Sequence, residues 1–208
     1  GKPLLGWAID QAKSISRIRR VIVSTDCAEI AKVARNYGAE VPFLRPKNLS
    51  EDDSLEWNAW RHALEYLKND ESRLPDVMVS IPTTAPLRNI SDIDRCIDEY
   101  EKGGADIIVT VTEANNNPWF NMVYYLDDGL VELVNKPSDK VSRRQDAPVV
   151  YNMTTVAYVA NSNFVMEKDG HFSGKVRAVH IPIERAVDID TLMDFEFASF
   201  LMQKRGKK

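Results

Sequence analysis

The stretch "DVMVSIPTTAPLRNISDIDRCIDEYEKGGADIIVTVT", residues 76–112, combines the two sequence periods of an α/β protein. Its ends, "DVMVSI" and "DIIVTVT", are short β-branched runs that predict strands, and the second run is apolar enough for a strand covered on both faces. Between them, "SDIDRCIDEYEKGG" has the apolar spacing of an amphipathic helix that ends at Gly103. The loop "PTTAPLRN" contains two prolines, which cannot extend a sheet. Strand and helix in turn predict a layered α/β domain.

The same alternation continues on both sides of this stretch. Apolar periodicity predicts helices at residues 4–12, 27–38, 54–69 and 191–201 and strands at residues 20–26, 41–44 and 176–183. The rhythm changes at "FNMVYYLDDGLVELV" (residues 120–134), where two apolar runs flank a turn at Gly129 and predict a β-hairpin, and a strand "VVYNMTTVAYVA" follows. We expect a single domain over residues 1–208, with residues 119–150 as an inserted lid or subunit contact.

Composition excludes several classes of protein. The chain has 208 residues, of which 44% are hydrophobic and 28% charged, as in an ordinary globular domain. No apolar run approaches the ~18 residues of a membrane span, and no signal peptide opens the chain, so we expect a soluble, cytoplasmic protein. Cys27 and Cys96 lie beside acidic residues and are expected to be free thiols. A net charge of −4 and a lone basic tail, "KRGKK", argue against nucleic-acid binding.

Small hydroxyls, arginines and acids follow the predicted strands. In open α/β sheets, ligands bind beyond the carboxyl ends of the strands, so these side chains are expected to meet at one edge. Such a set suits a phosphate-bearing ligand with a metal ion. The residues that follow the strands include Asp26, Arg45, Thr84, Arg88, Asp188 and Asp190.

Two aspartates lie between the last predicted strand and the last predicted helix, in "AVDIDTLMDF" (residues 186–195). In an extended backbone, Asp188 and Asp190 point to the same side, and two carboxylates facing one point suit a hard cation. Alternatively, Asp190 or Thr191 only caps the helix that follows, since both residue types are favoured caps. The spacing alone leaves both interpretations open.

The sequence lacks several other catalytic patterns. It contains neither GxxxxGK[ST] nor GxGxxG, so a P-loop and a dinucleotide site are both unsupported. The three histidines, His62, His171 and His180, have no metal-ligand spacing, and no Ser-His-Asp or Cys-His arrangement stands out. Of the chemistries considered, metal-assisted phosphoryl or nucleotidyl transfer is the one that the sequence still supports.

Five motifs occur in the order seen in the acylneuraminate cytidylyltransferase family, which the chain resembles over essentially its whole length. They are "VIVSTDCAEIAKVARNYGAEVPFLRP", "PTTAPLR", "NPWFNMV", "RRQDAPVVYNMTTVAYV" and "VDIDTLMDF". The resemblance implies a three-layer, Rossmann-like α/β nucleotidyltransferase fold with a mixed sheet. It also implies a homodimer whose hairpin, at about residues 119–134, forms the subunit contact. The implied reaction transfers CMP from CTP to a nonulosonic (sialic-type) acid with Mg²⁺ and releases pyrophosphate.

The resemblance also implies roles for individual residues. Asp188 and Asp190 resemble the catalytic, metal-binding aspartates. The implied nucleotide-binding residues are Asp26, Arg45, Thr84 and Arg88, and the implied sugar-binding residues are Arg143, Arg144, Gln145 and Tyr158.

Some positions depart from the family pattern. Pro82 stands where many members have Gln, and Thr154-Thr155 replaces an Asn-Gly pair, so the identity of the acid stays open. "NPWFNMV" and "YNMTTVAYV" lean toward relatives that handle bacterial nonulosonates such as legionaminate. The family's first strand and basic loop, of the type "ARGGSKG", are absent here, so we expect an upstream segment and weak activity without it. The alternatives are an enzyme for another acid, such as 3-deoxy-manno-octulosonate, and an inactive binding or dimerisation module.

Overall fold

The structure, a computed structural model, describes residues 1–136, 141 and 143–205. Its centre is a four-stranded sheet in the order β1-β5-β2-β6. β2 and β6 run parallel, whereas β5 runs antiparallel to β1 and to β2. The mixed sheet predicted from the sequence is therefore confirmed. Its strands are β1 (Val77–Ser80), β2 (Ile107–Glu113), β5 (Tyr151–Asn161) and β6 (Val176–His180).

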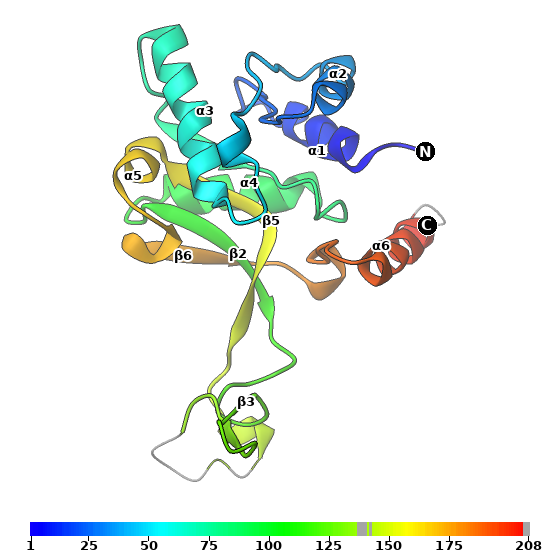
Figure 1. Cartoon of the computed structure of the whole chain (residues 1–208), viewed down its shortest axis with the longest axis vertical. Coiled ribbons are helices and arrows are strands. Elements are labelled where there is room, and N and C mark those ends of the chain that lie inside the picture. Colours follow the sequence, from blue (N-terminus) through cyan, green and yellow to red (C-terminus); the bar gives the residue numbers. More distant parts are fainter. Residues whose placement is uncertain (137–140, 142, 206–208) are drawn as a thin grey trace.

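Helices cover both faces of this sheet (Figure 1). Successive residues of a strand point to opposite faces, so Ile108 packs toward α4 while Ile107 packs toward α3 and α5. The three layers are thus α4, the sheet, and α3 with α5. The helices are α1 (Leu4–Lys13), α2 (Ala28–Asn36), α3 (Glu56–Glu71), α4 (Ile90–Glu101), α5 (Ser162–Glu167) and α6 (Leu192–Arg205). Short 3-10 turns are η1 (Lys47–Leu49), η2 (Arg144–Asp146), η3 (His171–Ser173) and η4 (Ile183–Arg185).

Two segments predicted as strands do not join the sheet. Residues 20–26 form an isolated bridge with Glu40, through hydrogen bonds from Val23 N to Glu40 O (2.9 Å) and from Glu40 N to Val21 O (2.8 Å), and a further bond links Arg45 N to Thr25 O (2.8 Å). Residues 41–44 form no strand. The strand prediction was wrong because β-branched residues favour an extended backbone, but a ladder also needs a neighbour. Here a cavity separates Val21 and Val23 from β1.

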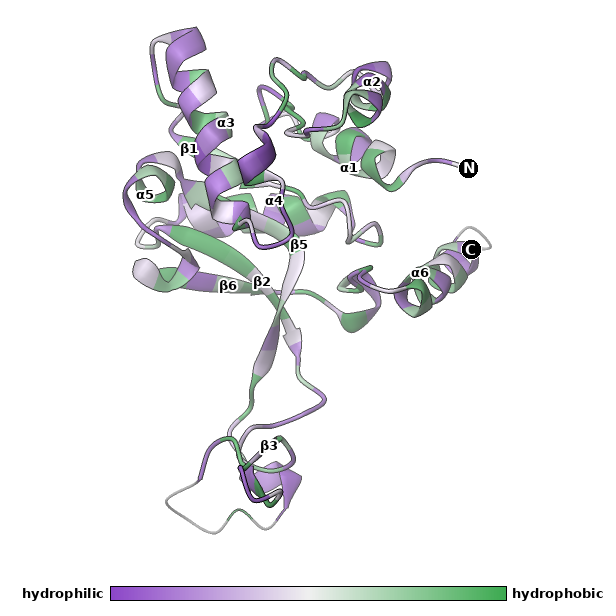
Figure 2. Ribbon diagram, viewed as in Figure 1, coloured by the Kyte–Doolittle hydropathy of each residue, from purple (hydrophilic) through white to green (hydrophobic). Residues whose placement is uncertain are grey.

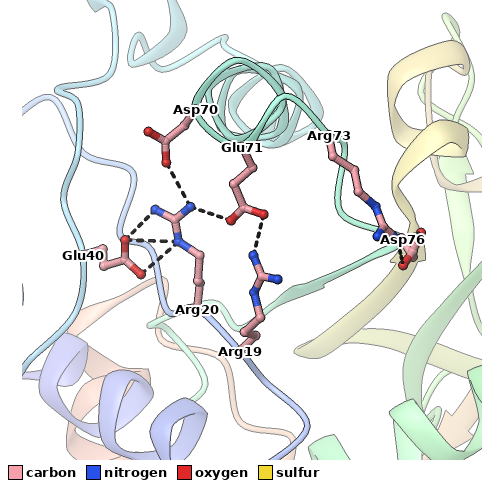
Figure 3. Close-up of polar contacts among 7 residues, drawn as sticks. All are labelled: Arg19, Arg20, Glu40, Asp70, Glu71, Arg73 and Asp76. Atoms are coloured by element: carbon pink, nitrogen blue, oxygen red, sulfur yellow. Dashed lines mark hydrogen bonds and ion pairs between the residues drawn. The ribbon is translucent and has the colours of Figure 1, made fainter.

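α1 and α2 form a small core of their own, which ion pairs connect to α3. Arg20 contacts Glu40 (2.6 Å), Glu71 (2.7 Å) and Asp70 (3.1 Å), and Arg19 also pairs with Glu71 (Figure 3). These contacts fix the segment that follows Arg20 relative to the C-terminal end of α3. The small core consists of Ile9, Ala31, Ala34, Ala39 and Val41.

Residues 114–150, hereafter the arm, leave the sheet between β2 and β5 and extend away from it (Figure 1). The arm contains an antiparallel hairpin of β3 (Val123–Tyr125) and β4 (Val131–Leu133), which confirms the predicted hairpin. Its turn is closed by a hydrogen bond from Leu126 N to Leu130 O (2.8 Å). Gly129 adopts φ +83°, which explains the glycine at that position. Part of the arm, residues 137–140 and 142, lies outside the described residues.

The structure also bears on the predictions about membrane spans and cysteines. No helix in the described part of the chain is both long and apolar enough to span a membrane. Cys27 and Cys96 are free thiols, as predicted. The last three residues of the basic tail, 206–208, lie outside the described residues.

Candidate active site

The acidic segment and the loop after β1 meet at one edge of the sheet. β6 lies parallel to β2, and the chain then passes through η4 to Asp188 and Asp190. Ile189, between the two acids, donates its backbone N–H to Thr84 O at 2.9 Å. The structure therefore brings together Thr84 and the two aspartates, as expected for residues that follow the carboxyl ends of parallel strands.

The cap of α6 is formed by residues other than Asp188 and Asp190. Asp194 Oδ2 accepts a hydrogen bond from Thr191 N (2.8 Å), and Thr191 Oγ1 accepts one from Asp194 N (3.3 Å). This reciprocal pair satisfies the first turn of the helix. Thr191 Oγ1 also donates to Asp194 Oδ2 (2.7 Å), and this bond, together with the one from Thr191 N, lowers the pKa of Asp194. The interpretation of Thr191 as a cap is confirmed, and that of Asp190 as a cap is wrong.

The two aspartates therefore keep acceptor capacity. Asp188 Oδ1 is buried without a hydrogen-bond partner, and no hydrogen bond to the Asp190 carboxylate occurs among the described residues. A buried acceptor without a partner is costly, and such a group calls for an explanation such as an ion or ligand.

Arg88 is buried behind this edge. Its Nε donates to Ala85 O (2.8 Å) and its Nη2 donates to Pro82 O, so the side chain holds the turn of its own loop. Its Nη1 is buried without a partner. Burial lowers the pKa of Arg88 to about 10, and the nearby carboxylate of Asp188 partly offsets that effect. A role in nucleotide binding stays a prediction for Arg88.

Glu56, the first residue of α3, belongs to the same group but was missed in the sequence. Its Oε1 accepts hydrogen bonds from Trp60 Nε1 (3.1 Å) and Ser80 Oγ (3.4 Å). Although the residue is exposed overall, its carboxyl group has lost hydration, which raises its pKa, and the charge of Asp188 adds to the effect. In sequence it looks like any acid in a first helical turn, so no local signal distinguished it.

We expect Glu56→Gln to stabilise the fold at pH 7 but not at pH 3.5. Because its pKa is raised on folding, the folded state binds the proton more tightly, and stability is lost as pH rises through the ordinary glutamate range. Gln can still accept from Trp60 and Ser80, so removing the charge removes that loss. Thermal melts at the two pH values measure this, with exposed Glu65→Gln on the same helix as control. An equal gain at both pH values would show that the charge is not the cause.

Tyr158, on β5, pairs with Ser80 of β1 and lies near Glu56 of α3. It is buried against Trp60 (ring centroids 5.4 Å apart) and His171 (5.2 Å). Burial raises the pKa of Tyr158 to about 12, with contributions from Glu56 and Asp188. The phenol is therefore neutral at physiological pH. Its predicted role in sugar binding stays a prediction.

A cavity of about 720 Å³ opens between the Val21–Ser24 segment and β1. Arg45, predicted at the nucleotide edge, lines it and is oriented by hydrogen bonds from its Nε to Ser50 Oγ (2.9 Å) and from its backbone N to Thr25 O (2.8 Å). Asp26 is exposed and is not among the lining residues. The volume suits a small ligand. The polar residues that line it include Ser24, Arg45, Ser80 and Thr83, which follow or end the extended segments, and Glu56 at the start of α3.

The predicted sugar-binding arginines lie on the arm. Arg143 pairs with Asp146 (2.8 Å), and Arg144 donates to Asn115 O (2.7 Å); Gln145 is exposed in the same 3-10 turn. Figure 1 shows the arm extending away from the edge where α6 begins. Within one chain, these three residues are therefore not brought to Asp188 and Asp190.

The donor set at Asp188 and Asp190 fits one type of metal ion. In the described part of the chain, no group of three or more His, Cys, Asp and Glu side chains could hold a metal. Mg²⁺, however, is commonly held by one or two carboxylates, with phosphates and water completing its shell. A pair of carboxylates with unused oxygens is consistent with that pattern; neither carboxylate lines the cavity, but Thr83, which does, precedes the Thr84 that bonds Ile189 N.

Comparisons with known proteins agree with this arrangement. Residues 1–205 match the family model described as "Cytidylyltransferase". The post-translational flagellin modification protein B of Campylobacter coli is 30% identical over 98% of this chain and 85% of its own length. A pseudaminic acid cytidylyltransferase of Campylobacter jejuni is 29% identical over 97% of this chain and 85% of its own.

A solved structure shows the same fold. A CMP:2-keto-3-deoxy-manno-octonic acid synthetase complexed with CTP superposes with a TM-score of 0.71 at 11% identity, covering 99% of this chain and 89% of that one. The predicted nucleotidyltransferase fold is thereby confirmed. Because the family model spans nearly every residue, the chain belongs to the cytidylyltransferase family.

Proposed function

We propose that the protein transfers CMP from CTP to the anomeric hydroxyl of a nonulosonic acid and releases pyrophosphate. The observation that carries this proposal is the position of Asp188 and Asp190, which do not cap α6 and lie beside Thr84 at the carboxyl edge of the sheet. The family, and the similarity to a pseudaminic acid cytidylyltransferase, support the choice of CTP and of the acid. CTP is a cytoplasmic nucleotide, so the proposed reaction places the protein in the cytoplasm.

In the proposed reaction, the anomeric hydroxyl passes its proton to one of the two aspartates, and its oxygen forms a bond to the α-phosphorus while the bond from that phosphorus to pyrophosphate breaks. Positioning and charge neutralisation dominate such a step. Mg²⁺, held by Asp188 and Asp190, would neutralise phosphate charge and stabilise the leaving group. Arg45 at the cavity wall and the loop of Thr84 and Arg88 would orient the nucleotide.

The sugar subsite would combine residues of two subunits. Arg144 is exposed on the arm and makes no ion pair among the described residues, so its guanidinium could bind the carboxylate of the acid in a bidentate manner. Because the arm does not reach Asp188 of its own chain, we propose a homodimer in which it reaches the partner. Arg143 and Gln145 accompany Arg144, and Tyr158 would lie under the same subsite.

An assay of product formation tests the function. The chain is incubated with Mg²⁺, each of the four ribonucleoside triphosphates, and each of several acids: pseudaminic, legionaminic, N-acetylneuraminic and 3-deoxy-manno-octulosonic acid. We expect a CMP-nonulosonate, identified by mass, when the triphosphate is CTP and no product with the other three triphosphates. The resemblance predicts low turnover by residues 1–208, so a version extended by the family's first strand and basic loop is assayed in parallel.

Other results would redirect the proposal. Product with 3-deoxy-manno-octulosonate alone would make the protein a cytidylyltransferase for that shorter acid. Tight CTP binding by both versions without any product would identify a binding module instead of an enzyme.

A further inference from the structure

Two segments that lie far apart in the sequence supply the candidate active site. The first, hereafter the loop segment, is residues 82–89, which include Thr84. The second, hereafter the acidic segment, is residues 183–190, which end at Asp190. Their relative position depends on the contacts that join them. One such contact, beside the aspartates, is the hydrogen bond from Ile189 N to Thr84 O (2.9 Å).

Arg205, the last residue of α6, joins the same two segments at a second place. Its Nη1 donates a hydrogen bond to Leu87 O, and its Nη2 donates one to Glu184 O (3.2 Å). Arginine suits such a contact because its planar guanidinium presents several donors in a fixed fork. One side chain therefore bridges the loop segment and the acidic segment.

The guanidinium of Arg205 occupies this position at an electrostatic cost. Burial lowers the pKa of Arg205, the neighbouring charge of Arg185 lowers it further, and the charges of Glu184 and Asp92 oppose these effects. Burial and a like charge both disfavour the charged form of a group. A partly buried cation is tolerated when its donors are satisfied, and here two backbone carbonyls accept from it. The bridge is therefore a specific contact that offsets a penalty.

Packing alone orients α6 weakly. Ala198 is the one buried residue among its described residues, Leu192–Arg205. α6 lies to one side of the sheet, beyond the carboxyl end of β6, and its apolar residues are spread around the helix instead of gathered on one face (Figures 1 and 2). A helix that is oriented by packing presents an apolar stripe to the core. Within this chain, the direction of α6 therefore depends on how its two ends are held.

The first turn of α6 is hydrogen-bonded to the backbone of Asp190. Asp194 Oδ2 accepts from Asp190 N (3.3 Å) and from Thr191 N (2.8 Å). At about 1.5 Å per residue, Asp190 lies roughly 12 Å along the helix from Ala198, so a tilt of about 10° at Ala198 would move Asp190 by about 2 Å. Metal ligands keep their distances within about 0.2 Å. A tilt of α6 would therefore take Asp190 out of a coordinating position.

From these observations we propose that Arg205 is a positioning residue for the candidate active site. By bonding Leu87 O and Glu184 O, it fixes the end of α6 that is farthest from Asp190, and thereby the position of Asp190 relative to the loop segment. That Asp190 binds a metal rests on the proposed function, whereas the bridge between the two segments does not. In the sequence, a basic residue in the last turn of a helix looks like a partner of the helix dipole, so no local pattern indicates this role.

Hydrogen exchange of the Ile189 amide tests the bridge without any ligand. This amide is bonded to Thr84 O, so its exchange rate reports how often the two segments separate. We expect Arg205→Ala to raise that rate about 10-fold or more. The matched control is Lys204→Ala, which removes the neighbouring cation of the same helical turn, a side chain that lies over the ring of Phe200 (4.6 Å). It should leave the exchange rate of Ile189 unchanged.

Binding of Mn²⁺ tests the consequence for the site. Free Mn²⁺ is measured by electron paramagnetic resonance in the presence of CTP, on residues 1–208 and on the extended version. Loss of a group that orients metal ligands commonly lowers metal affinity 10- to 100-fold, so we expect Arg205→Ala to raise the Mn²⁺ dissociation constant about 10-fold or more. Lys204→Ala should leave it unchanged. Arg205→Lys keeps the charge but lacks the planar fork, so it should recover only part of the affinity.

The Mg²⁺ dependence of turnover supplies a third readout. In the version that forms product, Arg205→Ala should raise the Mg²⁺ concentration for half-maximal pyrophosphate release about 10-fold, with a smaller change in the rate at saturating Mg²⁺. A general loss of folded protein would instead lower the rate at every Mg²⁺ concentration.

Several results would overturn this role for Arg205. An unchanged exchange rate of Ile189 in Arg205→Ala would overturn the bridge, as would an equal increase in Lys204→Ala. Faster exchange with an unchanged Mn²⁺ dissociation constant, or full recovery of affinity by Arg205→Lys, would overturn the positioning role. If the unsubstituted chain binds no Mn²⁺ with CTP, the proposed function fails, and faster exchange of Ile189 in Arg205→Ala would still support the bridge.

Discussion

Asp190→Asn is expected to lower turnover by about 10³-fold or more while leaving the fold intact, the size of effect seen when a metal ligand or a preorganised electrostatic group is lost. Asn keeps the shape of the side chain but cannot hold a divalent cation as a carboxylate does. Since Asp190 makes no side-chain hydrogen bond in the described part of the chain, its charge is not needed for folding. The measurement is the steady-state rate of pyrophosphate release, made on whichever of the two versions, residues 1–208 or the extended one, forms product.

Asp194→Asn is the matched control, four residues along the same segment. Asp194 accepts hydrogen bonds from Thr191, so its substitution should weaken the cap by about 1 kcal/mol and leave turnover close to normal. Normal turnover by Asp190→Asn would contradict a metal-binding role for this residue.

Arg185→Ala should lower the free energy of unfolding by about 3–5 kcal/mol, the largest stability effect that we expect, because it leaves the buried carboxylate of Asp92 without its arginine partner. Asp92 is fully buried, and both of its oxygens accept from Arg185, at 2.9 Å from Nε and 3.0 Å from Nη2. This pair holds η4 against the start of α4. Arg185 lies three residues before Asp188 in the sequence. For a chain of this size, the loss corresponds to a fall in Tm on the order of 10 °C.

Arg95→Ala controls for the general loss of a cation near Asp92. Arg95 lies 4.0 Å from the same carboxylate but is half exposed, so its removal should cost about 1 kcal/mol or less. Urea denaturation of both variants measures the difference. Equal losses for Arg185→Ala and Arg95→Ala would show that Asp92 does not depend on its partner in η4.

Much of the fold could be predicted from local patterns. The amphipathic helices from α1 to α4, the strands β1, β2, β5 and β6, and the hairpin turn at Gly129 all follow the predicted ranges closely. The failure at residues 20–26 has a specific cause. A strand exists through its neighbours, and the apolar alternation of Val21 and Val23 specifies an extended backbone without specifying a partner.

The candidate active site, like the fold, could be predicted only in part. Thr84, Asp188 and Asp190 could be placed together because the carboxyl ends of parallel strands share one edge. Glu56 could not, because its proximity to Asp188 depends on how α3 packs on the sheet through Trp57 and Trp60. The arm residues, such as Arg144, have a place in the site only through an assembly of two copies.

The central claim is that Asp188 and Asp190 hold the divalent cation on which CMP transfer depends. Crystals grown with CTP and Mn²⁺, measured for anomalous scattering, test it most directly. We expect a manganese peak within coordination distance of both carboxylates and of the nucleotide phosphates. A peak bound to other residues, or both carboxylates turned away from a nucleotide bound at this edge, would contradict the claim.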